Sequence, residues 1–268
     1  MKESCFSLPD GRTLNWYEHG HGRTLVLLHG WATSAAVFTE MAELLGENFR
    51  MLIPDLPGHG KSTPSPDNDL VGIAADLSCW LAAVSRTPIM LAGWSLGGMI
   101  ALQLISQRKL QVERLALIGT TPRFTQDDDW LFGLPAGQVH ALARNLRRRF
   151  ETTLADFFAL AFSSEKISPE RLREIRNFAV KRSSAPDRQA ALGLLGMLAV
   201  QDQRDILPAI KTPALVLHGD QDQVAPFAAG RYLAEKLPNG QLLNFSGIGH
   251  APFLSQPQVA AAKIREFF

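Results

Sequence analysis

The chain has 268 residues, of which 46% are hydrophobic and 20% charged, as in a globular protein with a large core. Its formal net charge is +1, so no global field indicates nucleic acid or an anionic membrane as a partner. The N-terminal stretch lacks the apolar segment of a secretory signal, and no window approaches the roughly 18 apolar residues of a membrane span, so we expect a cytoplasmic protein.

The first part of the chain alternates short strands and helices. Asp10-Gly11 favours a tight turn between two strands, Phe6–Leu8 and Leu14–Glu18. The continuous apolar run Thr24–His29 predicts a strand that is buried on both faces. The same patterns predict further strands at Met51–Pro54, Pro88–Ala92 and Leu115–Gly119, and helices at Phe38–Leu45, Leu70–Val84 and Leu96–Ser106.

The alternation stops after Thr121. From there to about Val200 we find no buried strand, and apolar residues recur at helical spacing from Leu142 to Phe158. Ser168-Pro169 is typical of a helix start, with serine at the cap and proline at the first position. Strands resume at Pro213–His218 and Gln241–Phe245, with helices expected at Phe227–Leu237 and Gln256–Phe268.

This order of elements predicts an α/β protein with a mostly parallel sheet covered by helices on both faces. We expect residues 1–120 and 200–268 to form that core. Residues 121–199 are then an inserted helical cap, or lid, over the ends of the strands.

The pentapeptide Gly93-Trp94-Ser95-Leu96-Gly97 fits the pattern G-x-S-x-G. A serine at a tight turn between a strand and a helix has a strained backbone, so its neighbours must be small. A buried strand is expected before the motif and a helix after it. We therefore interpret Ser95 as a catalytic nucleophile.

A serine hydroxyl is a weak nucleophile and needs a neighbouring base. In sites of this kind the acid and then the histidine follow the serine along the chain. His250, in a glycine-rich loop after the last strand, fits the base. Asp220 and Asp222 both follow the strand before it, and either could hold the imidazole tautomer.

An oxyanion hole needs two backbone N–H groups. One is expected from Leu96, the residue after the nucleophile, and the other from Trp31, beside Gly30. The indoles of Trp31 and Trp94 then flank the site, where Trp94 either packs under the turn or contacts substrate.

No His, Asp or Glu cluster has metal-ligand spacing, and no glycine-rich dinucleotide motif follows a strand. Cys5 and Cys79 make neither a disulfide framework nor a metal site. We therefore expect no metal and no cofactor.

Four motifs together resemble the α/β-hydrolase superfamily along almost the whole chain. They are His29-Gly30-Trp31, Asp55-Leu56-Pro57-Gly58-His59-Gly60, Gly93-Trp94-Ser95-Leu96-Gly97-Gly98 and Gly249-His250-Ala251-Pro252-Phe253. The sequences of these motifs, with Ser255-Gln256-Pro257 after the last, are most similar to those of the BioH carboxylesterases, the pimeloyl-acyl-carrier-protein methyl ester esterases of biotin synthesis.

The resemblance implies a serine carboxylesterase that removes a methyl ester from a carrier-bound acyl chain through an acyl-enzyme on Ser95. It implies Asp222 rather than Asp220 as the acid beside His250. We also expect the chain to be a monomer. The cap segment that contacts the acyl chain in this family corresponds to residues 157–161. The substrate contacts so implied are Trp31, Trp94, Ser95, Leu96, Phe157, Phe158, Ala159, Leu160, Ala161 and His250.

The expected cap is basic. Residues 140–190 hold eleven Lys and Arg against six Asp and Glu. Arg144, Arg147 and Arg148 share one helical face, which either docks an acidic acyl-carrier protein or is simply solvated. In the resembled family, arginines stand just before the acyl-contacting segment, where this chain has Thr152 and Asp156.

Two other functions stay open. The same fold could carry a broad carboxylesterase, or a related hydrolase or C–C-bond lyase, acting on small free substrates. A non-catalytic binder on the same scaffold is the alternative from another class, although such proteins usually lose a member of the triad. Ser95 argues against haloalkane dehalogenases and epoxide hydrolases, which carry aspartate at that position.

Overall fold

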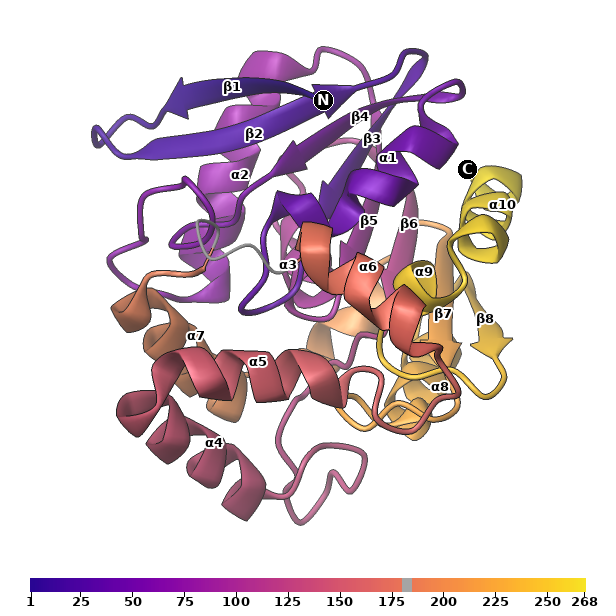
Figure 1. Cartoon of the computed structure of the whole chain (residues 1–268). Helices are drawn as coiled ribbons and strands as arrows, with labels where there is room; N and C mark the ends of the chain where they lie inside the picture. The colour runs from indigo at the N-terminus through magenta and orange to yellow at the C-terminus, as the bar shows by residue number, and fades with distance from the viewer. Residues whose placement is uncertain (180–184) are drawn as a thin grey trace.

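A computed structural model describes residues 1–179 and 185–268 and is built around one eight-stranded sheet (Figure 1). The strand order is β1-β2-β4-β3-β5-β6-β7-β8. β1 and β2 pair antiparallel, as do β2 and β4, and every other pair is parallel. The strands are β1 (Lys2–Ser7), β2 (Thr13–His19), β3 (Arg23–Leu28), β4 (Phe49–Pro54), β5 (Ile89–Trp94), β6 (Val112–Ile118), β7 (Ala214–Gly219) and β8 (Gly240–Phe245). The predicted α/β class with a mostly parallel sheet is confirmed.

Both faces of the sheet are covered, as the apolar run in β3 predicted. Successive side chains of a strand point to opposite faces, and Leu25 and Leu27 belong to one core cluster whereas Val26 and Leu28 belong to the other. Helices α2 (Leu70–Val84), α3 (Leu96–Ser106) and α8 (Phe227–Lys236) pack in the second cluster. The first cluster includes residues of η1 (Ala35–Phe38), α1 (Thr39–Leu45), α9 (Pro252–Ser255) and α10 (Pro257–Phe267).

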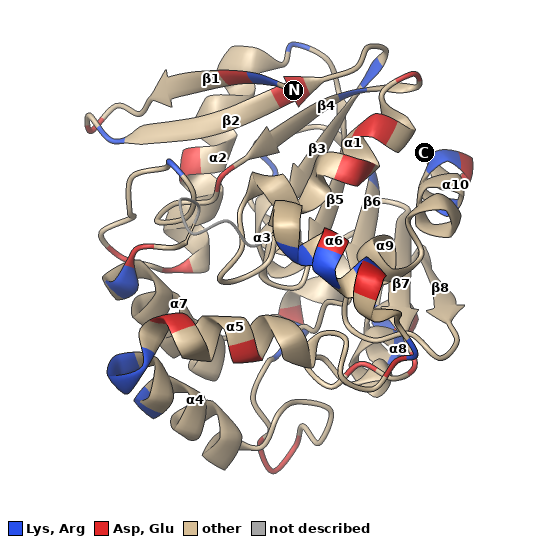
Figure 2. Cartoon of the chain, viewed as in Figure 1, with Lys and Arg blue, Asp and Glu red and all other residues tan. Residues whose placement is uncertain are grey.

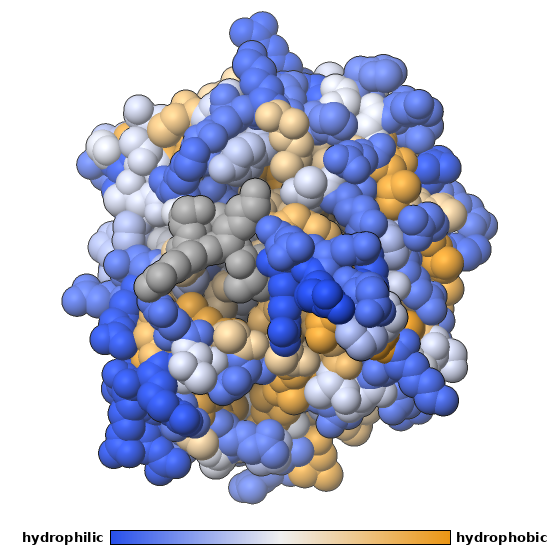
Figure 3. All heavy atoms as spheres, viewed as in Figure 1, coloured by the Kyte–Doolittle hydropathy of each residue, from blue (hydrophilic) through white to orange (hydrophobic). Residues whose placement is uncertain are grey.

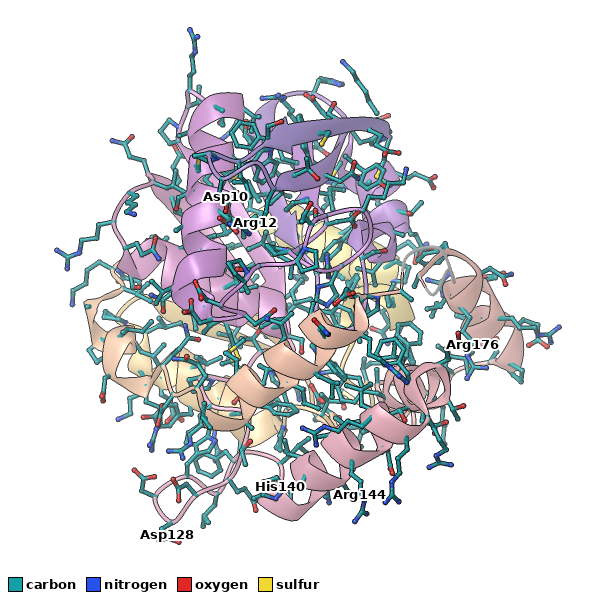
Figure 4. The ribbon with its side chains drawn as sticks, turned by 90° about the vertical axis from the view of Figure 1, so that its left-hand side faces the viewer. Asp10, Arg12, Asp128, His140, Arg144 and Arg176 are labelled. Carbon is teal, nitrogen blue, oxygen red and sulfur yellow. The ribbon has the colours of Figure 1, made fainter. Side chains whose placement is uncertain are left out.

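The N-terminal hairpin is held against α2 by one arginine. Gly11 has a φ of 87°, which allows the predicted turn. Arg12 donates to both carboxylate oxygens of Asp76 on α2, at 2.6 and 2.8 Å, and to Asp10 in the turn itself. Figure 4 shows Asp10 and Arg12 side by side next to α2.

Helices α4 (Ala136–Arg148), α5 (Phe150–Leu160), α6 (Pro169–Ala179) and α7 (Arg188–Val200), followed by η3 (Arg204–Ala209), separate β6 from β7. These two strands are neighbours in the sheet. We call α4 to α7 with their connections the cap; α4, α5 and α7 lie together in the lower part of Figure 1. The continuous helical spacing is divided at Arg149, whose φ of −139° and ψ of 61° end α4 and begin α5.

The start of α6 follows the sequence signal. Pro169 is its first residue, and the hydroxyl of Ser168 accepts a hydrogen bond from the N–H of Arg171 at 3.1 Å. Within the described ranges, 1–179 and 185–268, no helix is long and apolar enough to cross a membrane.

Candidate active site

Ser95 stands at the turn between β5 and α3. Its φ of 55° and ψ of −119° lie outside the usual regions for a residue with a side chain. The N–H of Ser95 donates to the carbonyl of Ile118 on β6 at 2.9 Å, which holds this conformation in place. Ser95 is half-buried, so the strained turn leaves its side chain accessible.

The two glycines of the motif are required for steric reasons. A Cβ atom on Gly93 would lie 2.3 Å from the carbonyl oxygen of Gly97. A Cβ atom on Gly97 would lie 2.1 Å from the carbonyl oxygen of Leu28. No side chain fits at either place, so the turn can form only with glycine there.

His250 and Asp222 form a buried pair. His250 Nδ1 lies 2.8 Å from Asp222 Oδ2, and the exposed fractions of the two residues are 2% and 5%. The other oxygen of Asp222 accepts from the N–H groups of Val224 and Ala225, each at 2.8 Å. Burial alone would raise the pKa of Asp222, but the neighbouring His250 and His218 outweigh it and hold that pKa below its usual range. Asp222 therefore stays ionised at neutral pH.

Asp220 has a different role. Its carboxylate accepts from the N–H of Gly247 at 2.7 Å, and this hydrogen bond is the main cause of its lowered pKa. It shapes the loop that carries His250, and it is Asp222 that the structure brings to the imidazole.

His218 is a neighbour of the pair that the sequence analysis did not single out. Its Nε2 lies 3.3 Å from Asp222 Oδ2 and donates to the carbonyl of Ala225 at 2.7 Å. A Cβ atom on Gly230 would lie 2.3 Å from its Nδ1, so the fully buried ring fits only beside glycine. A histidine at the end of a strand gave no local signal of this contact.

The remaining ring nitrogen of His250 has no fixed partner. Within the part of the chain that the structure describes, the buried Nε2 makes no hydrogen bond, and none joins it to Ser95 Oγ. Both residues line the same pocket. Hydrogen bonds between a nucleophile and its base are often long before substrate binds.

The 30–33 loop approaches Ser95 closely. A Cβ atom on Gly30 would lie 3.0 Å from the indole of Trp94 and 3.3 Å from Cβ of Ser95. Leu96 is the first residue of α3, so its N–H has no acceptor within the helix. The positions of Leu96 and Trp31 fit the predicted oxyanion hole, which stays a prediction.

Two buried histidines hold this loop. His59 Nε2 accepts from the N–H of Ala32 at 3.2 Å. His29 Nε2 accepts from the N–H of Leu56 at 2.9 Å, so its Nδ1 is the donor to the carbonyl of Gly30 at 2.9 Å. Burial lowers the pKa of His29 to about 4 and that of His59 to about 3. Both rings are therefore neutral at pH 7, as an N–H acceptor must be.

A pocket lies over Ser95, between the core loops and the cap. One helical face of α5 supplies its cap side, because positions three and four apart lie together. Ala159, Leu160 and Leu96, which were also predicted to contact substrate, are not part of the lining, so for them the contact stays a prediction. The lining residues are Gly30, Trp31, Ala32, Thr33, Trp94, Ser95, Leu154, Phe157, Phe158, Ala161 and His250.

Aromatic residues connect the pocket to both layers. The rings of Phe157 and Trp31 meet edge to face, with centroids 4.8 Å apart. Trp94 lines the pocket and also donates its indole N–H to the carbonyl of His250 at 3.0 Å. Packing and pocket lining are thus combined in Trp94.

A shallow groove between α4 and α5 adjoins the pocket through Phe157. Apolar side chains form much of it, and Figure 3 shows apolar atoms exposed over these helices. Its lining is Leu134, Gln138, Ala141, Leu142, Asn145, Thr153, Asp156, Phe157 and Leu160.

The arginines of α4 are exposed. Figure 2 shows basic segments gathered at the end of α4 and the start of α7, and Figure 4 shows Arg144 on the outer side of α4. Arg144, Arg147 and Arg148 form no ion pair within residues 1–179 and 185–268. Lys181 and Arg182, which belong to the basic count, lie outside the described residues. No group of three metal-ligating side chains occurs in the described ranges.

Comparison with known proteins gives concordant results. Residues 23–257 match the family defined by the alpha/beta hydrolase fold. The chain is 37% identical to a pimeloyl-(acyl-carrier protein) methyl ester esterase of Chromobacterium violaceum over 89% of this chain and 91% of that protein. It is 34% identical to the protein of that name from Nitrosospira multiformis, over 92% and 95% of the two chains. Among solved structures, an esterase from Exiguobacterium antarcticum superposes with a TM-score of 0.90, 28% identity and 98% of each chain covered.

Proposed function

The chain belongs to the α/β-hydrolase family and, within it, to the pimeloyl-(acyl-carrier protein) methyl ester esterases, and on this premise we propose that it hydrolyses the methyl ester of pimeloyl-acyl-carrier protein in biotin biosynthesis. It is a carboxylic ester hydrolase. The observation that carries the proposed mechanism is the buried Asp222–His250 pair, whose imidazole lines the same pocket as Ser95.

The proposed reaction has two halves. In the first, His250 Nε2 takes the hydroxyl proton while Ser95 Oγ attacks the ester carbonyl carbon. The N–H groups of Trp31 and Leu96 stabilise the charge on the carbonyl oxygen. The bond to the methoxy oxygen then breaks, and His250 returns the proton so that methanol leaves.

Water completes the second half. His250 removes a proton from the water as its oxygen attacks the acyl-enzyme, and the proton then passes to Ser95 Oγ. The product is a free carboxylate on the still carrier-bound acyl chain. Asp222 stays ionised throughout, which keeps the imidazole tautomer fixed and stabilises the imidazolium.

We assign the carrier to the cap surface. Acyl-carrier proteins are acidic, so an exposed basic helix is complementary to them. Arg144, Arg147 and Arg148 lie on the same helix as one wall of the α4–α5 groove, which leads to Phe157 in the pocket. This arrangement supports a path by which the carrier's acyl chain reaches Ser95.

A second candidate is an esterase for small free esters. It is favoured by Asp156, an exposed acid in the groove where the resembled family has a basic approach. The similar solved structure from Exiguobacterium antarcticum is also described only as an esterase.

Hydrolysis of pimeloyl-acyl-carrier-protein methyl ester should be measured against short p-nitrophenyl esters. We expect a higher kcat/KM on the carrier substrate, and a loss of about 10⁶-fold in kcat for Ser95→Ala on both. Restoration of biotin-independent growth to a strain lacking its own esterase is the cellular counterpart. Far better turnover of the short esters would favour the second candidate.

The carrier surface is tested by charge reversal. Arg147→Glu and Arg148→Glu should lower kcat/KM about tenfold for the carrier substrate, because repulsion slows docking, and leave short esters unaffected. Lys263→Glu on α10 is a charge-matched control away from the cap. Equal activity of all three variants on the carrier substrate would show that the carrier docks elsewhere.

A further inference from the structure

The loop that carries His250 is attached to the cap. Between α5 and α6 the cap presents Ala161 and Glu165 to this loop. The N–H of His250 donates to the carbonyl of Ala161 at 2.9 Å. The N–H of Gly249 donates to Glu165 Oε2 at 2.7 Å, and the hydroxyl of Ser255 donates to Glu165 Oε1 at 2.6 Å. Two consecutive amides and one side chain of the core are therefore bound by one short cap segment.

The loop and the cap segment are in close backbone contact at Gly249. A Cβ atom on Gly249 would lie 2.3 Å from the carbonyl oxygen of Ala161 and 3.4 Å from Glu165 Oε2. Any side chain at this position would push the cap segment away. Glycine before the histidine thus permits the backbone of the loop to meet the cap directly.

Glu165 acts here as an acceptor of hydrogen bonds. No Lys or Arg in the described ranges, 1–179 and 185–268, forms an ion pair with it. Burial raises the pKa of Glu165, against the opposing effect of its hydrogen bonds from Ser255 and Gly249. Partial burial of a carboxylate without a cation costs free energy. The hydrogen bonds from its two donors offset this cost for Glu165.

These bonds bear directly on the imidazole. On the core side, the carbonyl of His250 accepts from Trp94 and its Nδ1 meets Asp222. On the cap side, Ala161 and Glu165 hold its backbone N–H and that of the preceding residue. His250 is thus held by contacts from the core and from the cap.

We propose that Glu165 is a positioning residue for His250, which fixes the base loop to the cap so that cap and base move as one body. The inference rests on the proposed function, in which His250 is the base. It makes the cap part of the catalytic geometry as well as the wall of the pocket. A carrier seated on the cap would then act on the base through this contact.

Three variants test the proposal on a short p-nitrophenyl ester, which needs no carrier. Glu165→Ala should lower kcat about tenfold, because a small displacement of a catalytic group is costly, and leave KM within about twofold. Glu165→Gln keeps an oxygen for the Gly249 N–H and should retain at least half of the wild-type kcat. Glu170→Ala, at an exposed carboxylate on α6, is the matched control and should equal the wild type.

Proton NMR gives a readout that does not depend on turnover. The Nδ1 proton between His250 and Asp222 should give a resolved downfield resonance in the wild type and in Glu170→Ala. In Glu165→Ala it should broaden or disappear, because the loop opens to water. If Glu165→Ala does not fold, Ser255→Ala removes one of the two bonds and should weaken the same resonance.

The results separate this proposal from the proposed function. If Glu165→Ala keeps both its kcat and the downfield resonance, Glu165 does not position the base. The same conclusion follows if Glu165→Gln is as impaired as Glu165→Ala. If the wild type hydrolyses no ester but the resonance depends on Glu165 as described, the proposed function fails whereas the contact stands.

Discussion

The core side and the cap side of the pocket are built by different means. On the core side, Ser95, Asp222 and the 30–33 loop are held by backbone hydrogen bonds and by glycines that admit no Cβ atom. On the cap side, α4 and α5 present apolar side chains and exposed arginines that have no such constraint. We infer that the reaction depends on backbone geometry, whereas substrate choice depends on side chains that can change one at a time.

After replacement of the nucleophile itself, the largest effect is expected at the acid. Asp222→Asn should lower kcat about 10⁴-fold on every ester, because an amide favours the wrong imidazole tautomer. Asp220→Asn, at the neighbouring carboxylate that binds the N–H of Gly247, should lower kcat far less. Steady-state kinetics on one short ester compares the two, and a larger loss in Asp220→Asn would reverse the assignment of the acid.

The next effect concerns stability and pH. The pKa values of His29 and His59 are lowered in the folded chain. Below the ordinary value of 6.5, the unfolded chain therefore binds protons that the folded chain does not bind. Stability should therefore fall as pH decreases from about 6.5 towards 4. At pH 5 the loss is about 2 kcal/mol for each histidine, since one pKa unit corresponds to about 1.4 kcal/mol.

Urea unfolding at pH 7.5 and pH 5 measures this loss. His59→Gln offers an oxygen to the Ala32 N–H but has no proton to bind, so it should lose about 2 kcal/mol less than the wild type between the two pH values. An equal loss in wild type and variant would mean that His59 is not neutral in the folded chain.

The smallest effect is expected on the cap. Phe157→Ala removes the ring that packs on Trp31, and should raise KM about tenfold for a pimeloyl ester while kcat for an acetate ester stays within about twofold. Val200→Ala, at an exposed apolar residue at the end of α7 and outside both the pocket and the groove, is the control. A loss of kcat on the acetate ester would indicate that this side chain also supports the core side.

Most helices and strands of the core could be predicted from the sequence, because the patterns that indicate them are local. The bounds of α2 and α3 agree with their predicted ranges, and Asp69 caps α2 by accepting from Gly72 at 2.6 Å. The strained turn at Ser95 was likewise predictable, since Gly93 is required by an atom within the motif itself, although Gly97 is required by the neighbouring strand β3. In such places the pattern and the three-dimensional cause coincide.

Other features depend on contacts that no local pattern encodes. The break at Arg149 divides one helical periodicity into two helices, although apolar spacing continues across it. The carboxylate of Glu165 meets partners 84 and 90 residues away, and the ring of His218 reaches Asp222 only because β7 ends beside it. From the residues alone, Asp220 and Asp222 were equally good candidates for the acid. The folded loop distinguishes them, because Asp220 binds Gly247 and Asp222 contacts His250.

The cap leaves the sheet after β6 and returns at β7, two strands that lie side by side. An insertion with adjacent ends can be lengthened, shortened or exchanged during evolution without disturbing the strands that flank it. Relatives of this fold can thus acquire new substrates by changing this one segment. In this chain the exchange has a condition, because a new cap would have to bring an acceptor for the Gly249 N–H along with its new pocket.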